Sequence, residues 1–465
     1  MPAGLVQLFY LVAAVLFVLA LKGMSHPRTA VRGNQMGSLG MLIAIVATVV
    51  GQQVVSFPVI LAGMAVGGLV GVLMATRPAM TNIPQVVALF NGFGGAASFL
   101  AVGASLQEVV EPGAAAALDL QFTVSAAVSA LIGAVAFTGS VVAFGKLQGI
   151  MTERPVLLPG RHLLNALLFL ASLGLGAWLV VQPAALPFWV LAAIACLLGV
   201  MLVIPIGGAD IPVVISLLNA YSGLAAAAVG WALNNSMLII AGSLVGAAGF
   251  ILTALMSKAM NRSLPNIMFA GVGAKVAPAV KADEVYGGRV KSASPDEVAM
   301  LMESARRIVV VPGYGMAVAQ AQYAIQDLMK ILEAKGVEVE FAIHPVAGRM
   351  PGHMNVLLAE ANIPYEKLRE MDDINPTFRQ TDVALVIGAN DVVNPAARNN
   401  EPGNPIAGMP IIDVDQARSV VVVKRSLSPG FAGIPNPLFA ADNTVMLFAD
   451  AKQAVLDLVV ALKRG

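Results

Sequence analysis

The stretch VVVPGYGMAVAQAQYAI, residues 309–325, decides the fold of the C-terminal half of the chain. A β-branched run ends at two glycines and passes into residues of helical period, a pattern typical of strand, glycine turn and helix. Gly313, Gly315 and Val318 occupy the three small-residue positions of a dinucleotide-binding fingerprint. The free N–H groups at the start of such a helix suit a phosphate. The same pattern fits an ordinary strand-to-helix turn, so the stretch alone leaves both interpretations open.

The composition requires a membrane. Of the 465 residues, 58% are hydrophobic and 12% are charged, too few charges for a water-soluble surface over the whole length. Residues 1–265 contain nine Lys and Arg and five Asp and Glu, whereas the remainder contains nineteen and twenty-two. This asymmetry predicts a membrane domain followed by a soluble domain. The one cysteine, Cys196, leaves no partner for a disulfide within these residues, and no metal site is expected.

Apolar runs in the first half predict nine membrane helices, each long enough to cross about 30 Å of hydrocarbon. They cover residues 4–22, 36–53, 57–76, 83–104, 119–145, 160–182, 186–206, 211–233 and 236–258. Basic residues lie in or beside alternate connections, namely Lys22, Arg28, Arg32, Arg77, Lys146, Arg154, Arg161, Lys258 and Arg262. Because positive charge stays on the cytoplasmic side, this predicts an external N-terminus and a cytoplasmic C-terminal domain.

The predicted helix interiors are almost free of ionisable side chains, which cost about 2.5 to 3.5 kcal/mol at the bilayer centre. Their polar positions carry amides instead, including Asn91 and Asn219, while Asp210 and His162 lie near the cytoplasmic ends. Asn91 could be a hydrogen-bonding fixture between helices or part of a hydrated pathway. The amides alone do not decide between these two roles.

After the membrane half, residues 263–290 are rich in Gly, Pro, Lys and Ser and predict a linker. The domain boundaries are therefore expected at 1–262, 263–290 and 291–465. A capped helix is expected after Ser294 or Asp296. Strands and helices then alternate, with strands at 308–312, 337–343, 365–371, 383–387, 410–414, 419–424 and 445–448 and helices at 317–335, 354–361 and 451–463. Such alternation predicts a doubly wound, mainly parallel α/β sheet of Rossmann-like type.

Polar loops follow several of these strands and should meet at one edge of the sheet. One of them, KRSLSPGFAG at 424–433, begins with Lys424, Arg425 and Ser426, two cations and a hydroxyl suited to a phosphate dianion. The second strand ends in His344, where an NAD site of the usual kind would have a carboxylate. This favours NADP over NAD. A solvated strand end remains the alternative for the cations, and His344 and His353 fit ordinary loop and cap positions.

The longer motifs carry a resemblance to a known family. GGADIPVVISLLNAYSG (207–223), HPVAGRMPGHMNVLLAEA (344–361), GANDVVNPAA (388–397), GMPIIDV (408–414) and KRSLSPGFAG look like the β subunit of the proton-translocating nicotinamide nucleotide transhydrogenase. The resemblance covers nearly the whole chain. It implies direct hydride transfer from NADH to NADP⁺, coupled to proton movement into the cytoplasm across a bacterial inner membrane. It also implies an α subunit that binds NAD(H) and adds membrane helices, a dimer of α–β units in lipid, and no nucleic-acid partner.

The resemblance carries residues over position by position as contacts of NADP(H). Those matched to the pyrophosphate turn are Gly313, Tyr314, Gly315, Met316, Ala317 and Val318, and Arg349 and Gly352 match a loop that also touches the nucleotide. Gly388, Ala389, Asn390 and Asp391 match the nicotinamide loop. Lys424, Arg425 and Ser426 match the 2′-phosphate site, and Gly430, Phe431, Ala432 and Gly433 match a lid, with Asp450 at a further strand end.

Two departures from the family pattern matter. Phe431 stands where many relatives have Tyr, and Asn91 stands where many have a membrane histidine. The proton step is therefore open for this chain alone, and Asp391, Asn91, Asn219 and Asp210 are the coupling candidates. No catalytic side chain is expected, because hydride transfer between two nicotinamides needs juxtaposition and exclusion of water more than an acid or base.

Two other functions are compatible with a membrane domain joined to a nucleotide-binding domain. The first is a channel or transporter gated by a nucleotide-sensing domain, but no selectivity-filter sequence of the TVGYG kind occurs. The second is a structural membrane anchor, which leaves the convergence of these polar loops unexplained. For Asp391, an Asx turn that only shapes its loop is the alternative to a coupling role.

Overall fold

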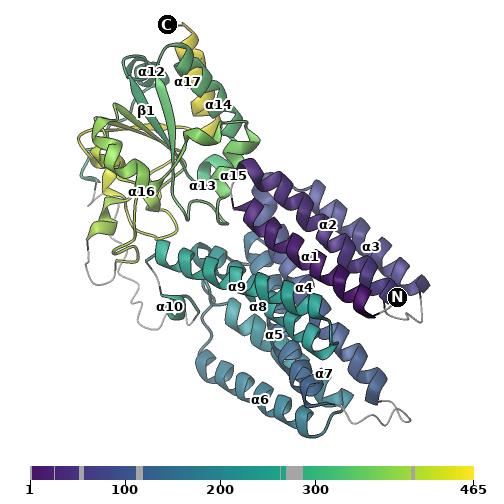
Figure 1. The fold of residues 1–465 in the computed structure, drawn as a ribbon. Helices are drawn as coiled ribbons and strands as arrows, with labels where there is room; N and C mark the ends of the chain where they lie inside the picture. The colour runs from purple at the N-terminus through teal and green to yellow at the C-terminus, as the bar shows by residue number, and fades with distance from the viewer. Residues whose placement is uncertain are drawn as a thin grey trace. The chain divides into compact units, whose positions relative to one another are not determined.

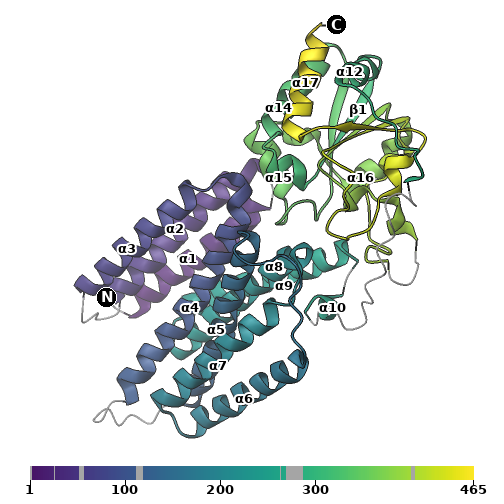
Figure 2. The same cartoon turned by 180° about the vertical axis from the view of Figure 1, so that it is seen from behind.

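The computed structural model describes residues 3–25, 27–51, 57–110, 119–261, 263–268, 286–399 and 404–464. They form two compact units, Met1–Gly207 with Val213–Thr253 and Gly208–Pro212 with Ala254–Gly465. Figures 1 and 2 show the first as helices and the second as a sheet covered by helices. Most of the predicted linker, residues 269–285, lies outside the described residues, so the boundaries at 262 and 290 stay predictions.

Within the described ranges, nine helices are long and apolar enough to cross a membrane, which confirms the expected number. They are α1 (Ala3–Met24), α2 (Pro27–Gly51), α3 (Phe57–Thr76), α4 (Ile83–Val110), α5 (Leu120–Leu147), α6 (Arg161–Val181), α7 (Ala185–Val203), α8 (Ile211–Ala232) and α9 (Ser236–Ala259). α2 begins well before residue 36, where its apolar run was expected to start. Its first turns are polar, so a search for apolar runs does not detect them.

Glycines bring backbones of the membrane helices into direct contact. A Cβ on Gly95 of α4 would lie 2.5 Å from the carbonyl oxygen of Gly133 in α5. Likewise, a Cβ on Gly223 of α8 would lie 2.9 Å from the carbonyl oxygen of Gly242 in α9. Close approach of this kind is the usual way in which membrane helices associate.

A charged side chain is buried at the end of one membrane helix. Lys146, expected beside a connection, belongs to the last turn of α5 and is 1% exposed. Its Nζ donates hydrogen bonds of 2.7 Å to the carbonyl oxygens of Ile204 and Ile206, just after α7. The cation thus satisfies carbonyls that the end of a helix leaves without partners.

The described part of the second unit contains a sheet of six parallel strands in the order β3-β2-β1-β4-β5-β6. The strands are β1 (Arg307–Pro312), β2 (Glu338–Ile343), β3 (Leu368–Glu370), β4 (Val383–Ile387), β5 (Ser419–Lys424) and β6 (Thr444–Phe448). This is the strand order of the doubly wound Rossmann fold and confirms the predicted fold class.

Alternating residues of the central strand enter two cores. Ile308 and Val310 face the core that α12 (Pro295–Glu303), α14 (Gln322–Ala334) and α17 (Ala451–Arg464) cover. These three helices lie together on one face of the sheet in both views (Figures 1 and 2). Val309 and Val311 face the second core, which also contains Phe378 and Phe439. α12 begins with the capping box of Ser294 and Glu297, so Ser294 is the cap that the sequence left undecided.

The predicted helix 317–335 is divided in two. The structure has a short helix α13 (Tyr314–Val318) and then α14. Between them Gln320 adopts a φ of 50°, and the N–H of Ala321 bonds the carbonyl of Met316 at 3.1 Å. A non-glycine residue in the left-handed region interrupts the helix.

The predicted strand at 410–414 is wrong. Residues 410–413 are not paired in the sheet, and a 3₁₀ turn, η7 (Val414–Gln416), follows them. Pro410 has no N–H to give a ladder, and its carbonyl lies 2.8 Å from Nε2 of His344. The predicted strand at 365–371 is confirmed in shortened form as β3. The remaining described elements are α10 (Leu264–Met268), α15 (His353–Glu360), α16 (Met371–Ile374), and the 3₁₀ helices η1 (Met80–Asn82), η2 (Gly208–Asp210), η3 (Tyr365–Lys367), η4 (Asn375–Gln380), η5 (Asp391–Val393), η6 (Pro395–Arg398) and η8 (Pro437–Ala440).

Candidate functional site

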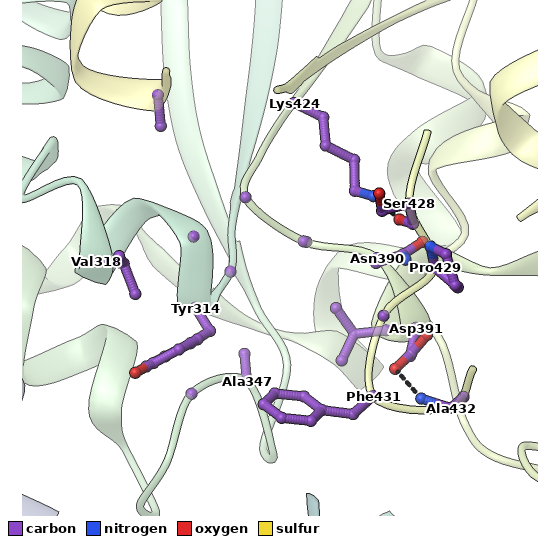
Figure 3. Close-up of a pocket in the computed structure, with 18 of the residues that line it drawn as sticks. Tyr314, Val318, Ala347, Asn390, Asp391, Lys424, Ser428, Pro429, Phe431 and Ala432 are labelled. Atoms are coloured by element: carbon purple, nitrogen blue, oxygen red, sulfur yellow. Dashed lines mark hydrogen bonds between the residues drawn. The ribbon is translucent and has the colours of Figure 1, made fainter. Parts of the chain in front are cut away.

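A cavity of about 530 Å³ lies at the carboxyl ends of β1, β4 and β5. The chain passes from β1 to β2 on one side, whereas β4 and β5 lie on the other, so the strand order reverses between β1 and β4. Open α/β sheets hold ligands at this switch point. The volume lies in the range of small-molecule sites. Figure 3 shows the side chains that surround it.

Two glycine turns form the floor of the cavity and pack backbone against backbone. A Cβ on Gly313 would lie 2.4 Å from the Cα of Ala389, and one on Gly315 would lie 2.7 Å from the Cα of Gly388. The N–H of Gly315 donates to the carbonyl of Gly388 at 2.9 Å. Gly388 has a φ of 67°, which favours glycine. Neither turn has room for a side chain where the two backbones meet. No side chain at these glycines would therefore stand between the backbone and a ligand.

An arginine and a tyrosine pack together on one side. The guanidinium of Arg349 lies 4.5 Å from the ring centroid of Tyr314, a cation–π contact. The backbone N–H of Arg349 donates to Nδ1 of His353 at 3.0 Å. Gly348, with a φ of 106°, brings its backbone so close to that imidazole that a Cβ would lie 2.5 Å from Nδ1. His353 thus fixes the loop that presents Arg349.

Both predicted loop histidines are buried and neutral at physiological pH. Burial lowers the pKa of His344 to about 4, and the hydrogen bond to the Pro410 carbonyl opposes this only in part. Burial, together with the nearby Arg349 cation, lowers the pKa of His353 to about 4. Each ring nitrogen Nδ1 accepts a backbone N–H, from Val346 and Arg349 respectively. These bonds support the loop and cap interpretation.

Asp391 joins the loop after β4 to the segment 424–433, which ends in the predicted lid residues 430–433 and which we call the lid as a whole. One carboxylate oxygen, Oδ2, accepts the N–H of Ala432 at 3.0 Å, as the dashed line in Figure 3 shows. A Cβ on Gly430 would lie 2.6 Å from Oδ1, so the lid backbone rests directly on the carboxylate. Burial raises the pKa of Asp391, and the Ala432 N–H and the Lys424 cation oppose this rise.

The predicted cation cluster is at the start of the lid. Lys424 Nζ donates to the carbonyl of Ser428 and lies 5.4 Å from the ring centroid of Phe439. Burial lowers the pKa of Lys424, and the Asp391 charge opposes this change. Ser426 Oγ lies 2.9 Å from Ser428 Oγ, and Arg425 also lines the cavity. The lid is therefore folded on itself by its own polar groups.

The structure brings most predicted nucleotide contacts to this one cavity. Those that line it are Gly313, Tyr314, Gly315, Val318, Arg349, Gly388, Ala389, Asn390, Asp391, Lys424, Arg425, Ser426, Gly430, Phe431, Ala432 and Asp450. Met316 and Ala317 are fully buried in the core, Gly352 caps α15, and Gly433 forms the end of the lid turn with a φ of 70°. Contact of any of these residues with a nucleotide stays a prediction.

Sequence reasoning missed two asparagines that hold the site together. Asn394 and Asn436 are fully buried, and each accepts the N–H two residues ahead, from Ala396 and Leu438. The Nδ2 of Asn394 donates to the carbonyl of Pro435 at 3.2 Å. Each asparagine precedes a proline, and such Asn-Pro pairs indicate turns with side-chain caps. That signal could have found both.

The coupling candidates on and beside the membrane helices are buried or half-buried. Asn91 of α4 is buried and donates through Nδ2 to the carbonyl of Ile215 in α8 at 3.2 Å. Asn219, one turn further along α8, is half-buried, and its carbonyl accepts the hydroxyl of Ser222. Asp210, in η2, is buried. Asn91 is thus an interhelical hydrogen-bonding residue, which does not exclude a hydrated pathway.

In the described residues, nine helices long and apolar enough to span a membrane are followed by a Rossmann-like domain with a cavity at its switch point, the features of a polytopic membrane protein with an α/β domain. Within the described ranges no group of His, Cys, Asp and Glu could hold a metal ion. The chain belongs to the family of NAD(P) transhydrogenase beta subunits, because residues 6–461 match that family's sequence profile.

Curated relatives agree with this assignment. A protein from Rhodospirillum rubrum named NAD(P) transhydrogenase subunit beta is 47% identical over 464 residues, covering 99% of this chain and 100% of the relative. A relative of the same name from a defined strain of that species matches to the same extent. The family is one of oxidoreductases that use nicotinamide nucleotides, and the word subunit implies a partner chain.

Proposed function

We propose that this chain binds NADP(H) in the cavity and, with an α subunit that binds NAD(H), transfers hydride from NADH to NADP⁺. The observation that carries the proposal is the convergence of three separate motifs on one cavity. The glycine turn at 313–315, the loop at 388–391 and the Lys424–Arg425–Ser426 cluster all line it. Two cations and a hydroxyl beyond β5 suit a phosphate that NADP has and NAD lacks.

The residues present fit such a nucleotide. Nδ2 of Asn390 is buried without a hydrogen-bond partner among the described atoms, and a bound polar group could supply one. The nicotinamide would supply the hydride chemistry. The chain itself would hold the phosphates with Lys424 and Arg425, and exclude water with the lid and the Phe431 ring. That ring lies 6.5 Å from the Tyr314 ring, centroid to centroid.

The membrane domain would couple this reaction to proton movement into the cytoplasm. The basic residues predict an external N-terminus and a cytoplasmic C-terminal domain in a bacterial inner membrane. Because a proton that crosses about 100 mV releases about 2.3 kcal/mol, coupling can bias two couples of similar potential. Asn91, Asn219 and Asp210 are the coupling candidates on the membrane side, and Asp391 is the candidate in the cavity.

Reconstitution of the chain with its α subunit in sealed vesicles tests the proposal. Addition of NADH and NADP⁺ should form NADPH stoichiometrically with NAD⁺ and change the pH of the vesicle lumen. Vesicles that contain this chain without the α subunit serve as the control and should do neither. Binding of NADPH without any hydride transfer in the complete assembly would favour a nucleotide sensor, and absence of NADPH binding would refute the site.

A further inference from the structure

Tyr286 is the first residue described after the stretch 269–285, which connects it along the chain to the membrane helices. It is 4% exposed and belongs to the second core of the sheet domain. Its ring stacks on Phe439, with the centroids 6.3 Å apart and an angle of 28° between the planes. Its hydroxyl accepts the backbone N–H of Asn436 at 3.2 Å. This tyrosine is far more buried than a linker residue needs to be.

Asn436 continues the connection to the proposed nicotinamide loop. Its Oδ1 accepts the N–H of Leu438 at 3.0 Å, which fixes the orientation of the amide. Its Nδ2 therefore points the other way and donates to both the backbone carbonyl and the side-chain oxygen of Asn390, at 3.1 and 3.2 Å. Because Asn436 is fully buried, water does not compete for these bonds. Tyr286 and Asn390 are thus joined through one fixed residue.

A second connection runs through Phe439 to the proposed phosphate site. Phe439 is fully buried, and the same ring that stacks on Tyr286 lies 5.4 Å from Lys424 Nζ. A shift of the Tyr286 ring would displace the face on which the lysine rests. Tyr286 therefore contacts neighbours of both halves of the cavity, the loop after β4 and the start of the lid.

The chain that follows Tyr286 is fastened to the sheet. A tight turn through Gly287 and Gly288, with φ of 50° and 71°, returns the N–H of Arg289 to the Tyr286 carbonyl at 2.9 Å. The N–H of Met446 in β6 then donates to the carbonyl of Lys291 at 2.7 Å, and Ala293 donates back to Met446 at 2.9 Å. A displacement that arrives along the chain from the membrane side would meet this anchor immediately after Tyr286.

We propose that Tyr286 is a positioning residue that transmits the state of the membrane domain to the nucleotide site, through Asn436 to Asn390 and through Phe439 to Lys424. The inference rests on the proposed function, because it assigns no binding of its own to Tyr286. It places the entry of the coupling signal at the junction of linker and sheet domain, away from every residue expected to touch the nucleotide.

The first test is the rate of NADPH release from the full-length chain in detergent, followed by nucleotide fluorescence. Tyr286→Phe keeps the stacked ring and removes the acceptor, and Asn436→Asp keeps the acceptor for Leu438 and removes the donors to Asn390. Each should speed release about three- to tenfold, since Tyr286→Phe loses one buried hydrogen bond and Asn436→Asp loses the two that Nδ2 donates to Asn390. The double variant should be faster than wild type by less than the product of the single effects.

Tyr323→Phe is the matched control, because Tyr323 is half exposed on α14 and its hydroxyl hydrogen-bonds Glu360. It should leave release unchanged. A lowered melting temperature with an unchanged release rate in Tyr286→Phe would make Tyr286 a structural residue only and overturn the inference. Failure of the wild-type chain to bind NADPH would instead refute the proposed function, and with it this inference.

The second test measures transmission itself. In sealed vesicles with the α subunit, an imposed pH gradient should change NADPH release from the wild-type complex, and this response should fall at least threefold in Tyr286→Phe. A full response to the pH gradient in both Tyr286→Phe and Asn436→Asp would overturn the inference while the proposed function stands. Absence of a response in the wild type would refute proton coupling, on which both depend.

Discussion

The carboxylate of Asp391 and the backbone N–H of Ala432 are joined by a 3.0 Å hydrogen bond across 41 positions of sequence. The bond ties the loop after β4 to the lid. Its acceptor is a carboxylate whose pKa burial raises above the ordinary value of 3.8. An ionised acceptor makes a stronger bond than a neutral one. Protonation of Asp391 would therefore weaken the bond that joins this loop to the segment 424–433.

The first prediction is that Asp391→Asn leaves NADP(H) bound but removes the pH dependence of its release. In the wild type, release should accelerate as the pH falls through the raised pKa of Asp391. Because that pKa is raised in the folded state, the carboxyl favours folding most below pH 3.8, and this contribution is lost as the pH rises through the raised pKa. Stopped-flow release measured against pH checks this.

The control for this variant is Asp457→Asn, the same chemical change on α17, where Asp457 accepts a hydrogen bond from Gln453. It should keep the wild-type profile. If Asp391→Asn also keeps both the wild-type release rate and its pH profile, Asp391 only shapes its turn.

The second prediction concerns Gly430→Ala. A Cβ there would lie 2.6 and 2.7 Å from the two carboxylate oxygens of Asp391, so the lid backbone or the carboxylate must shift and their contact is disturbed. NADPH affinity should fall about tenfold or more, with a matching rise in release rate, as calorimetry and stopped flow would record. Gly63→Ala on α3 is the control, because no described atom lies within 4 Å of the added carbon. Unchanged affinity in Gly430→Ala would mean that the bound state does not use this lid position.

The third prediction is nucleotide preference. A segment from about residue 284 to the C-terminus should fold alone, since both cores of the sheet domain are complete within it. It should bind NADPH at least about a hundredfold more tightly than NADH, because bonds to charged groups contribute about 1.5 to 3 kcal/mol each. Arg425→Ala should reduce the difference between the two affinities, mainly by weakening the binding of NADPH. Equal calorimetric affinities for the two nucleotides in the unaltered segment would contradict the phosphate site.

The fourth prediction is that Asn91→Leu, in the complex with the α subunit, severely slows proton-coupled turnover while NADPH affinity is unchanged. Asparagine cannot titrate, but it can order water, and Leu removes its bond to the Ile215 carbonyl as well. Phe90→Leu is the control on the neighbouring, exposed position of α4. Normal pumping by Asn91→Leu would return Asn91 to a packing role.

The fifth prediction is a stability effect in the membrane unit. Lys146→Met should lower the free energy of unfolding by about 2 to 4 kcal/mol, because buried carbonyls lose their donors. The carbonyls concerned are those of Ile204 and Ile206. Thermal unfolding in detergent would measure the loss. Lys22→Met, on an exposed position at the end of α1, should change it little, and equal stability of both variants would contradict the buried role of Lys146.

Much of the fold follows from pattern alone. The length of the apolar runs predicted the nine membrane helices of the described residues. The β-branched run before Gly313 predicted a strand in the centre of a parallel sheet. Both predictions succeeded because they depend on local sequence. The strand expected at 410–414 is wrong because Pro410 has no N–H for a sheet and its carbonyl is bonded to His344. The apolar pair Ile411 and Ile412 after it nevertheless has the composition of a strand. The helix break at Gln320 likewise depends on a local dihedral that apolar periodicity does not report.

The residues that line the cavity could be predicted from the sequence, but the residues that hold them in place could not. Lys424, Asp391 and Gly313 lie in motifs with recognisable chemistry, so their meeting at strand ends follows from the fold class. Tyr286 and Asn436 act through contacts between residues 150 positions apart, and neither carries a local signal of that pairing. Only tertiary structure reveals such supporting contacts.

The backbone contact between the turns at Gly313 and Gly388 leaves no slack between β1 and β4. The site therefore cannot open by separation of these two strands. The lid, by contrast, rests on the loop after β4 through the side chain of Asp391. We therefore expect a nucleotide to enter and leave by movement of residues 424–433, with the turns after β1 and β4 remaining in contact beneath it.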